Sequence, residues 1–155
     1  MKRLIVALAV VLFGCFQMGL PSRLSVFSLT PNYLLVLLAI VAIFSDRKGG
    51  AIVGFFCGAI EGSLVGINLT HYIASRVITG FILGWMNDLK LQRSVLLAVL
   101  TTVGGTLAAQ VILMFIAPPP EIIPFLGATI KTAMYNGVIA IPVYVLARPI
   151  AELRV

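Results

Sequence analysis

The chain has 155 residues, of which 61% are hydrophobic and only 10% are charged, and its formal net charge is +6. A soluble domain carries about 25% charged residues, so this composition excludes an ordinary soluble fold and indicates a protein surrounded by lipid. The positive charge does not indicate nucleic-acid binding, because the basic residues lie between apolar segments, where membrane topology signals are found.

Six apolar segments follow one another, and we expect each to be a transmembrane helix of one all-α integral membrane domain, residues 1–155. The segments span approximately residues 4–20, 31–45, 51–67, 69–86, 94–117 and 125–147. The first follows Lys2 and Arg3 as in a signal peptide, but its apolar run continues to Leu20, so we expect an uncleaved helix. The second has 15 residues and reaches only ~22 Å, so either its flanks extend it or the bilayer thins there.

The basic residues predict how these helices are oriented. With a cytoplasmic N-terminus, eight of the eleven Lys and Arg residues lie on the cytoplasmic side, whereas Arg23 alone lies outside. The eight are Lys2, Arg3, Arg47, Lys48, Lys90, Arg93, Arg148 and Arg154. This bias predicts an even number of spans with both termini in the cytoplasm. Residues 21–30 alternate loosely in polarity, and we expect a short interfacial segment there on the outer face.

Three ionisable residues, Glu61, Arg76 and Lys131, lie inside apolar segments. A charge in the hydrocarbon costs about 2.5–3.5 kcal/mol on insertion scales, so such residues usually face the bundle interior and find partners. Counting along each helix places all three ~9–10 Å below the outer surface, with Gln110 at a similar level. We therefore predict a polar layer in the outer half of the bilayer.

The role of this layer has three open interpretations. A tight turn near Asn68 makes segments 51–67 and 69–86 antiparallel neighbours, so Glu61 and Arg76 are expected to pair. In the first interpretation, this pair only fixes helix packing. In the second, the layer lines a pocket open to the outside, with an extra positive charge from Lys131. In the third interpretation, Lys131 or Arg76 extends outward to water.

The last apolar segment adds further polar groups to this candidate layer. Tyr135 lies one turn from Lys131, whereas Asn136 lies about 140° around the helix from it. Pro142 removes a backbone hydrogen bond and is predicted to kink the helix.

Glycines predict a groove for close helix packing, because residues four apart share one face of a helix. The third segment carries Gly54, Gly58, Gly62 and Gly66, and the fourth carries Gly80 and Gly84. The occupant of the groove is either a neighbouring helix of this chain or the single transmembrane helix of a partner.

Residues for catalysis are missing from the sequence. It holds no pair of acids placed for acid–base work, no Ser/His/Asp or Cys/His set, and no phosphate-loop or zinc motif. We therefore expect a protein that is not an enzyme and that needs no metal or cofactor.

From Pro31 to Arg148 the chain resembles the MreD family of bacterial rod shape-determining membrane proteins. The resemblance rests on the order and spacing of several pieces, and on the third segment with Gly54, Gly62 and Gly66. The pieces are "PNYLLVLLAIVAIFSDRKGGAIVG", "RVITGFILGWM" and "MYNGVIAIPVYVLARPI". One position departs from the family, since many relatives have an aspartate where this chain has Gly58, and the acid here is Glu61.

The resemblance implies a multi-pass scaffold of the cell-elongation complex in the bacterial cytoplasmic (inner) membrane. Such a scaffold binds MreC and, through it, is coupled to MreB filaments and to peptidoglycan synthases. The family is also similar in fold to the substrate-binding subunits of energy-coupling-factor transporters, so a vitamin-binding subunit is the alternative. Those subunits dock their partner through an Ala-xxx-Ala face on the first helix. Here Ala7 is followed four residues later by Val11, so this chain departs from that motif. Whether the protein forms a homo-oligomer stays open.

Overall fold

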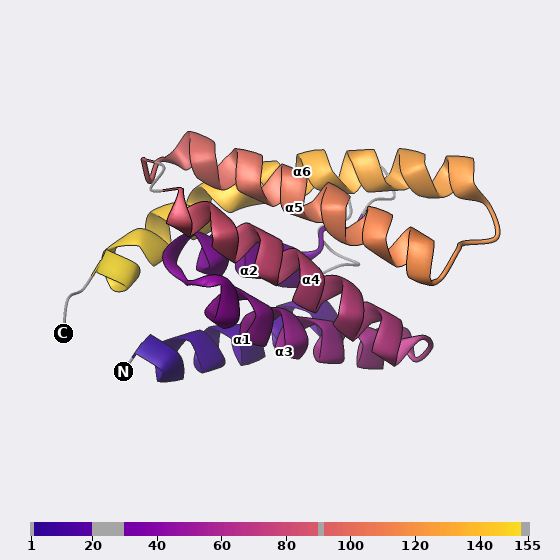
Figure 1. Cartoon of the computed structure of the whole chain (residues 1–155), viewed down its shortest axis with the longest axis horizontal. Helices are drawn as coiled ribbons and strands as arrows, with labels where there is room; N and C mark the ends of the chain where they lie inside the picture. The colour runs from indigo at the N-terminus through magenta and orange to yellow at the C-terminus, as the bar shows by residue number, and fades with distance from the viewer. Residues whose placement is uncertain (1, 20–29, 90–91, 153–155) are drawn as a thin grey trace.

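The computed structural model describes residues 2–19, 30–89 and 92–152, and over these residues the protein is all-helical (Figure 1). The helices are α1 (Lys2–Gly19), α2 (Tyr33–Phe44), α3 (Arg47–Val65), α4 (Leu69–Asp88), α5 (Val95–Ile116) and α6 (Ile122–Glu152). The expected all-α fold is confirmed, and each predicted segment corresponds to one helix whose ends differ by a few residues.

Some sequence predictions concern residues outside the described ranges. Positions 21–29 of the expected interfacial segment lie there, as do the topology residues Arg23, Lys90 and Arg154. The side chains of Lys2 and Arg3 are likewise not described.

Three of the described helices are long and apolar enough to cross a membrane, which indicates a membrane protein. They are Arg47–Val65, Val95–Ile116 and Ile122–Ala151. The apolar stretches Ile5–Gly19 and Tyr33–Phe44 are shorter.

Helix α2 forms the centre of the bundle. It packs against each of the other five helices that the structure describes, and all its residues except Val41 and Phe44 are buried. A helix that is apolar on every side is enclosed either by protein or by lipid, and here the other described helices enclose it. This explains its length of 12 residues, because a helix enclosed by protein does not have to span the hydrocarbon by itself.

Helices α3 and α4 meet along a seam of glycines. A Cβ atom added at Gly54 would collide with the carbonyl oxygen of Arg76, and one at Gly58 would lie 2.7 Å from Ile73 Cα. Gly80 faces Gly50 in the same way. The occupant of the predicted groove is therefore α4, a neighbouring helix of the same chain. The seam glycines are Gly50, Gly54, Gly58, Gly62, Gly80 and Gly84.

Gly66 does not belong to this seam, and its predicted place in the groove is wrong. Its φ of +76° is left-handed, and its N–H donates to Gly62 O at 3.0 Å, so it caps the end of α3. No atom lies within 4 Å of a Cβ built on it. Asn68 also has a positive φ, 57°, and the two residues form the tight turn that leads into α4.

The long helix α6 contains Pro142 and Pro149. In Figure 1 its C-terminal part runs in a different direction from its first part. This change of direction is what an interior proline produces, since it removes a backbone hydrogen bond and crowds the preceding turn.

Candidate functional site

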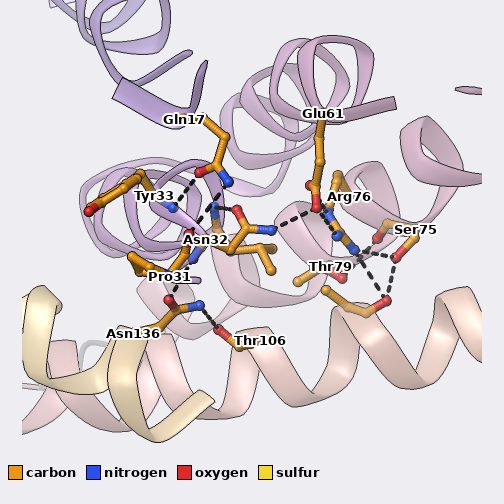
Figure 2. A network of polar contacts seen from close by, with 12 residues as sticks. Gln17, Pro31, Asn32, Tyr33, Glu61, Ser75, Arg76, Thr79, Thr106 and Asn136 are labelled. Carbon is orange, nitrogen blue, oxygen red and sulfur yellow. Dashed lines mark hydrogen bonds and ion pairs between the residues drawn. The ribbon is translucent and has the colours of Figure 1, made fainter. Parts of the chain in front are cut away.

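Glu61 of α3 and Arg76 of α4 form a buried ion pair across the glycine seam (Figure 2). Arg76 Nε donates to Glu61 Oε2 at 2.8 Å, and Arg76 Nη2 donates to Glu61 Oε1 at 2.7 Å. Two parallel charge-assisted hydrogen bonds are among the strongest polar contacts in proteins. The exposed fractions are 0% for Arg76 and 7% for Glu61, so the interpretation in which Arg76 extends to water is wrong.

The rest of the Arg76 guanidinium group faces α5. Its Nη1 donates to Ser75 Oγ at 3.1 Å and to the carbonyl oxygen of Ala109 at 3.4 Å. Ser75 Oγ itself donates to the same carbonyl at 2.5 Å. The ring of Tyr72 lies 5.4 Å from the guanidinium carbon, close enough for a cation–π contact. The cation is thus held by its own helix, by α3 and by α5.

Asn32 connects this pair to α2 and α6. Its Oδ1 accepts from Leu35 N at 3.0 Å, which makes it the N-cap of α2, and its Nδ2 donates to Glu61 Oε1 at 2.6 Å. Its backbone N–H donates to Asn136 Oδ1 at 2.9 Å. Asn32 was not among the site residues predicted from the sequence. The available signal was an asparagine placed just before an apolar helical run, the position that N-caps favour.

Two further links complete what we call the polar network. Asn136 Nδ2 donates to Thr106 Oγ1 of α5 at 3.1 Å. Gln17 of α1 accepts from Tyr33 N at 2.8 Å, and its Nε2 donates to the carbonyl oxygen of Pro31 at 3.4 Å. The polar network therefore contains residues from all six described helices, as Figure 2 shows around Asn32.

A cavity of about 280 Å³ opens beside the polar network, at the end of the bundle where α3 ends. Its lining residues are Gln17, Thr30, Pro31, Asn32, Glu61, Leu64, Val65, Gln110 and Thr132. Gln110 is half-buried, and its Oε1 is inaccessible to solvent and accepts no hydrogen bond from the described residues.

The structure brings some of the predicted polar residues together and separates others. Glu61 and Gln110 line one cavity, and Asn136 is fully buried in the polar network. Tyr135 is half-buried. Lys131 is exposed, so its predicted place in the buried layer and the extra positive charge it would add to a pocket are wrong. The turn of α6 directs Thr132 to the cavity and leaves Lys131 on the outer surface of the helix.

The side chains of this site form strong hydrogen bonds, and the two charges of the ion pair neutralise each other. Glu61 is neutralised by Arg76, and both of its oxygens already accept hydrogen bonds. Within the described part of the chain, no group of three or more His, Cys, Asp or Glu side chains could hold a metal ion. The arrangement can fix helices relative to one another and can offer amides and hydroxyls to a ligand.

Together, the fold and the polar network define a helical membrane protein with a buried ion pair at its centre. Comparisons of the chain with protein-family models, with curated proteins and with solved structures found no match. The site and the motifs of the sequence are therefore what bears on the function of this membrane protein.

Proposed function

We propose that the protein is a non-enzymatic membrane scaffold of the bacterial cell-elongation complex, the role implied by its resemblance to the MreD family. The observation that supports this most is the polar network. Its ionisable groups bind one another and tie six helices together, so they serve packing rather than proton transfer. Buried polar groups of this kind favour one arrangement of helices over alternatives, and a scaffold needs one defined surface.

In this proposal all six helices cross the cytoplasmic membrane, with both ends in the cytoplasm. The start of α1 and the end of α6 lie at the same end of the bundle in Figure 1, which supports an even number of crossings. Arg47 lies over the Trp85 ring at 5.3 Å and Arg93 lies over the Phe44 ring at 5.1 Å. Basic residues from the start of α3 and from the connection before α5 thus gather at that end, as the positive-inside rule expects for a cytoplasmic face.

The proposed partner is MreC, through which the scaffold is coupled to MreB filaments and to peptidoglycan synthases. The seam between α3 and α4 is filled by the backbones of those two helices. A partner's transmembrane helix therefore has to dock on another, lipid-facing surface of the bundle.

Depletion of the protein in its own bacterium tests the proposed function. Rod-shaped cells are expected to widen and become round as the protein is lost, and a wild-type copy supplied in trans should restore rods. If the cells instead stay rod-shaped and their growth comes to need a high concentration of a vitamin in the medium, the scaffold function is contradicted. That result would support the energy-coupling-factor alternative. Cells unchanged in both respects would contradict both functions.

A further inference from the structure

Lys131 of α6 is an exposed cation, and it forms no hydrogen bond or ion pair with the residues that the structure describes. The chain has five acidic residues. Glu61 is bound to Arg76, and Glu121 lies ten residues before Lys131, about 15 Å along the helix axis. The other three lie at the opposite end of the bundle from the cavity, next to the start of α3 or at the ends of α4 and α6; they are Asp46, Asp88 and Glu152. Lys131 therefore lacks a counter-ion within its own chain.

The side chains around Lys131 on the surface of α6 are apolar. Residues three or four positions apart share one face of a helix, and here that face is exposed except for the half-buried Gly127. We call it the Lys131 face, and its residues are Ile123, Gly127, Ile130, Lys131, Met134 and Val138. A charge surrounded by hydrocarbon costs about 2.5–3.5 kcal/mol on insertion scales, and lipid chains offer it no partner. A carboxylate placed against the Lys131 face would reduce this cost.

The depth of Lys131 favours a carboxylate within the membrane over the phosphate of a lipid headgroup. Lys131 follows Ile122, the first residue of α6, by nine residues, or about 13 Å along the helix axis. The four-carbon stem of a lysine spans only part of that distance. In the proposed six-span topology its ammonium group therefore lies below the headgroups, at a depth where the side chain of a partner's transmembrane helix can reach it.

The Lys131 face suits the helix of a different chain. Gly127 lies one turn from Lys131, and a Cβ atom added to it would meet no atom within 4 Å, so another helix can approach closely there. A second copy of the chain, docked on the same face in a twofold dimer, would bring two Lys131 ammonium groups together at one depth. Like charges repel strongly in a medium of low dielectric constant. The occupant that fits is therefore a different helix, which carries an Asp or Glu at the depth of Lys131.

We propose that the Lys131 face binds the transmembrane helix of the scaffold's single-span partner, and that an Asp or Glu of this helix forms an ion pair with Lys131. The inference rests on the proposed scaffold function. It adds to that function the surface on which the partner docks and the side chain by which the partner helix is recognised.

Photo-crosslinking in cells tests where the partner helix docks. The photoreactive residue p-benzoyl-phenylalanine replaces Val138 of the Lys131 face or, as a control, Ile78 of α4. Both positions are exposed, and each follows a residue of the polar network, Asn136 or Arg76, by two positions, so their depths are similar. We expect an adduct with the co-expressed MreC protein from Val138 and not from Ile78. An adduct with a second copy of the chain, no protein adduct, or an adduct formed equally from Ile78 would overturn the proposal.

Substitutions of Lys131 test the ion pair itself. Lys131→Met should reduce the amount of co-purified MreC at least about tenfold, because it leaves a carboxylate of the partner unpaired in the membrane. Lys131→Arg keeps the charge and should retain the partner. Lys131→Glu should lose the partner and regain it when the acidic residue of the partner helix is replaced by lysine.

The unfolding temperature of each variant shows whether it is folded, so that loss of binding is not mistaken for loss of structure. A folded Lys131→Met chain that captures MreC like wild type, or an MreC helix that contains no Asp or Glu, would overturn this inference alone. A wild-type chain that captures no MreC would contradict the scaffold function as well.

Discussion

The burial of Glu61 depends mainly on its pairing with Arg76, and the burial of Arg76 depends mainly on Glu61. Arg76 has no exposed surface, and its guanidinium group gives two hydrogen bonds to one carboxylate. Replacing one partner by an apolar residue leaves the other charge buried in a medium that cannot solvate it. Replacing both by apolar residues leaves no buried charge, which lipid and protein tolerate. Stability should therefore depend on the pair as a unit.

A double-mutant cycle on Glu61→Leu and Arg76→Met measures this coupling. Each single variant should lower the free energy of unfolding by about 3–5 kcal/mol, because an uncompensated charge stays buried. The double variant should lose less than the sum of the single losses, by about 0.5–3 kcal/mol. Unfolding in mixed detergent micelles, followed by circular dichroism, provides the free energies.

Lys131→Met serves as the control for this cycle. Lys131 is exposed, so its replacement should change the free energy of unfolding by no more than about 0.5 kcal/mol. Additive losses for Glu61→Leu and Arg76→Met would show that the two charges do not depend on each other.

At the scale of single helices, the start of α2 depends on one side chain with two roles. Asn32 caps α2 and also donates to the Glu61 carboxylate. Asn32→Ala should cost about 0.5–2 kcal/mol for the cap, and about 1.5–3 kcal/mol more for the hydrogen bond to a charged group.

Ser94→Ala isolates the capping contribution, because Ser94 caps α5 through the Leu97 N–H at 3.2 Å. Both alanine variants can be compared by the temperature at which the detergent-solubilised protein unfolds. Equal losses in the two variants would contradict the link between Asn32 and the ion pair.

The α3–α4 seam can be tested with a matched pair of glycine substitutions. Gly54→Ala places a methyl group against the backbone of Arg76, and such overpacking costs about 1–3 kcal/mol or more. Gly104→Ala meets no atom within 4 Å and should gain up to about 1 kcal/mol from helix propensity. Chemical unfolding of the two variants gives both values, and a Gly54→Ala protein as stable as Gly104→Ala would show that the seam is not tightly closed.

The helices and the ion pair could be predicted from the sequence, but the centre of the site could not. Long apolar runs and a short turn at Asn68 are local signals, and they were enough to pair Glu61 with Arg76. Asn32 joins the network through its contact with Asn136, which is distant in the chain, and no local pattern encodes such a contact. Counting residues along a helix also did not show which face packs inward, since Thr132 lines the cavity whereas the neighbouring Lys131 is exposed.

The whole molecule is expected to cross the membrane six times, and labelling with a membrane-impermeant maleimide tests this. Lys48, in the first turn of α3, and Glu121, directly before α6, are exposed and lie at opposite ends of the bundle. In a Cys15→Ala, Cys57→Ala background, Glu121→Cys should react in intact cells, whereas Lys48→Cys should react only after permeabilisation. The reverse pattern would invert the orientation, and labelling of both sites in intact cells would contradict the six-span topology.

The central claim is that this bundle is a scaffold that binds a single-span membrane protein. Native mass spectrometry of the chain co-expressed with the MreC protein of its own genome, in a membrane-mimetic that keeps both folded, tests it most directly. We predict a stable complex of defined stoichiometry that contains both chains, with the Gly104→Ala variant as a folded control. If the chain appears only without MreC while both proteins are folded and abundant, the scaffold function proposed for it is contradicted.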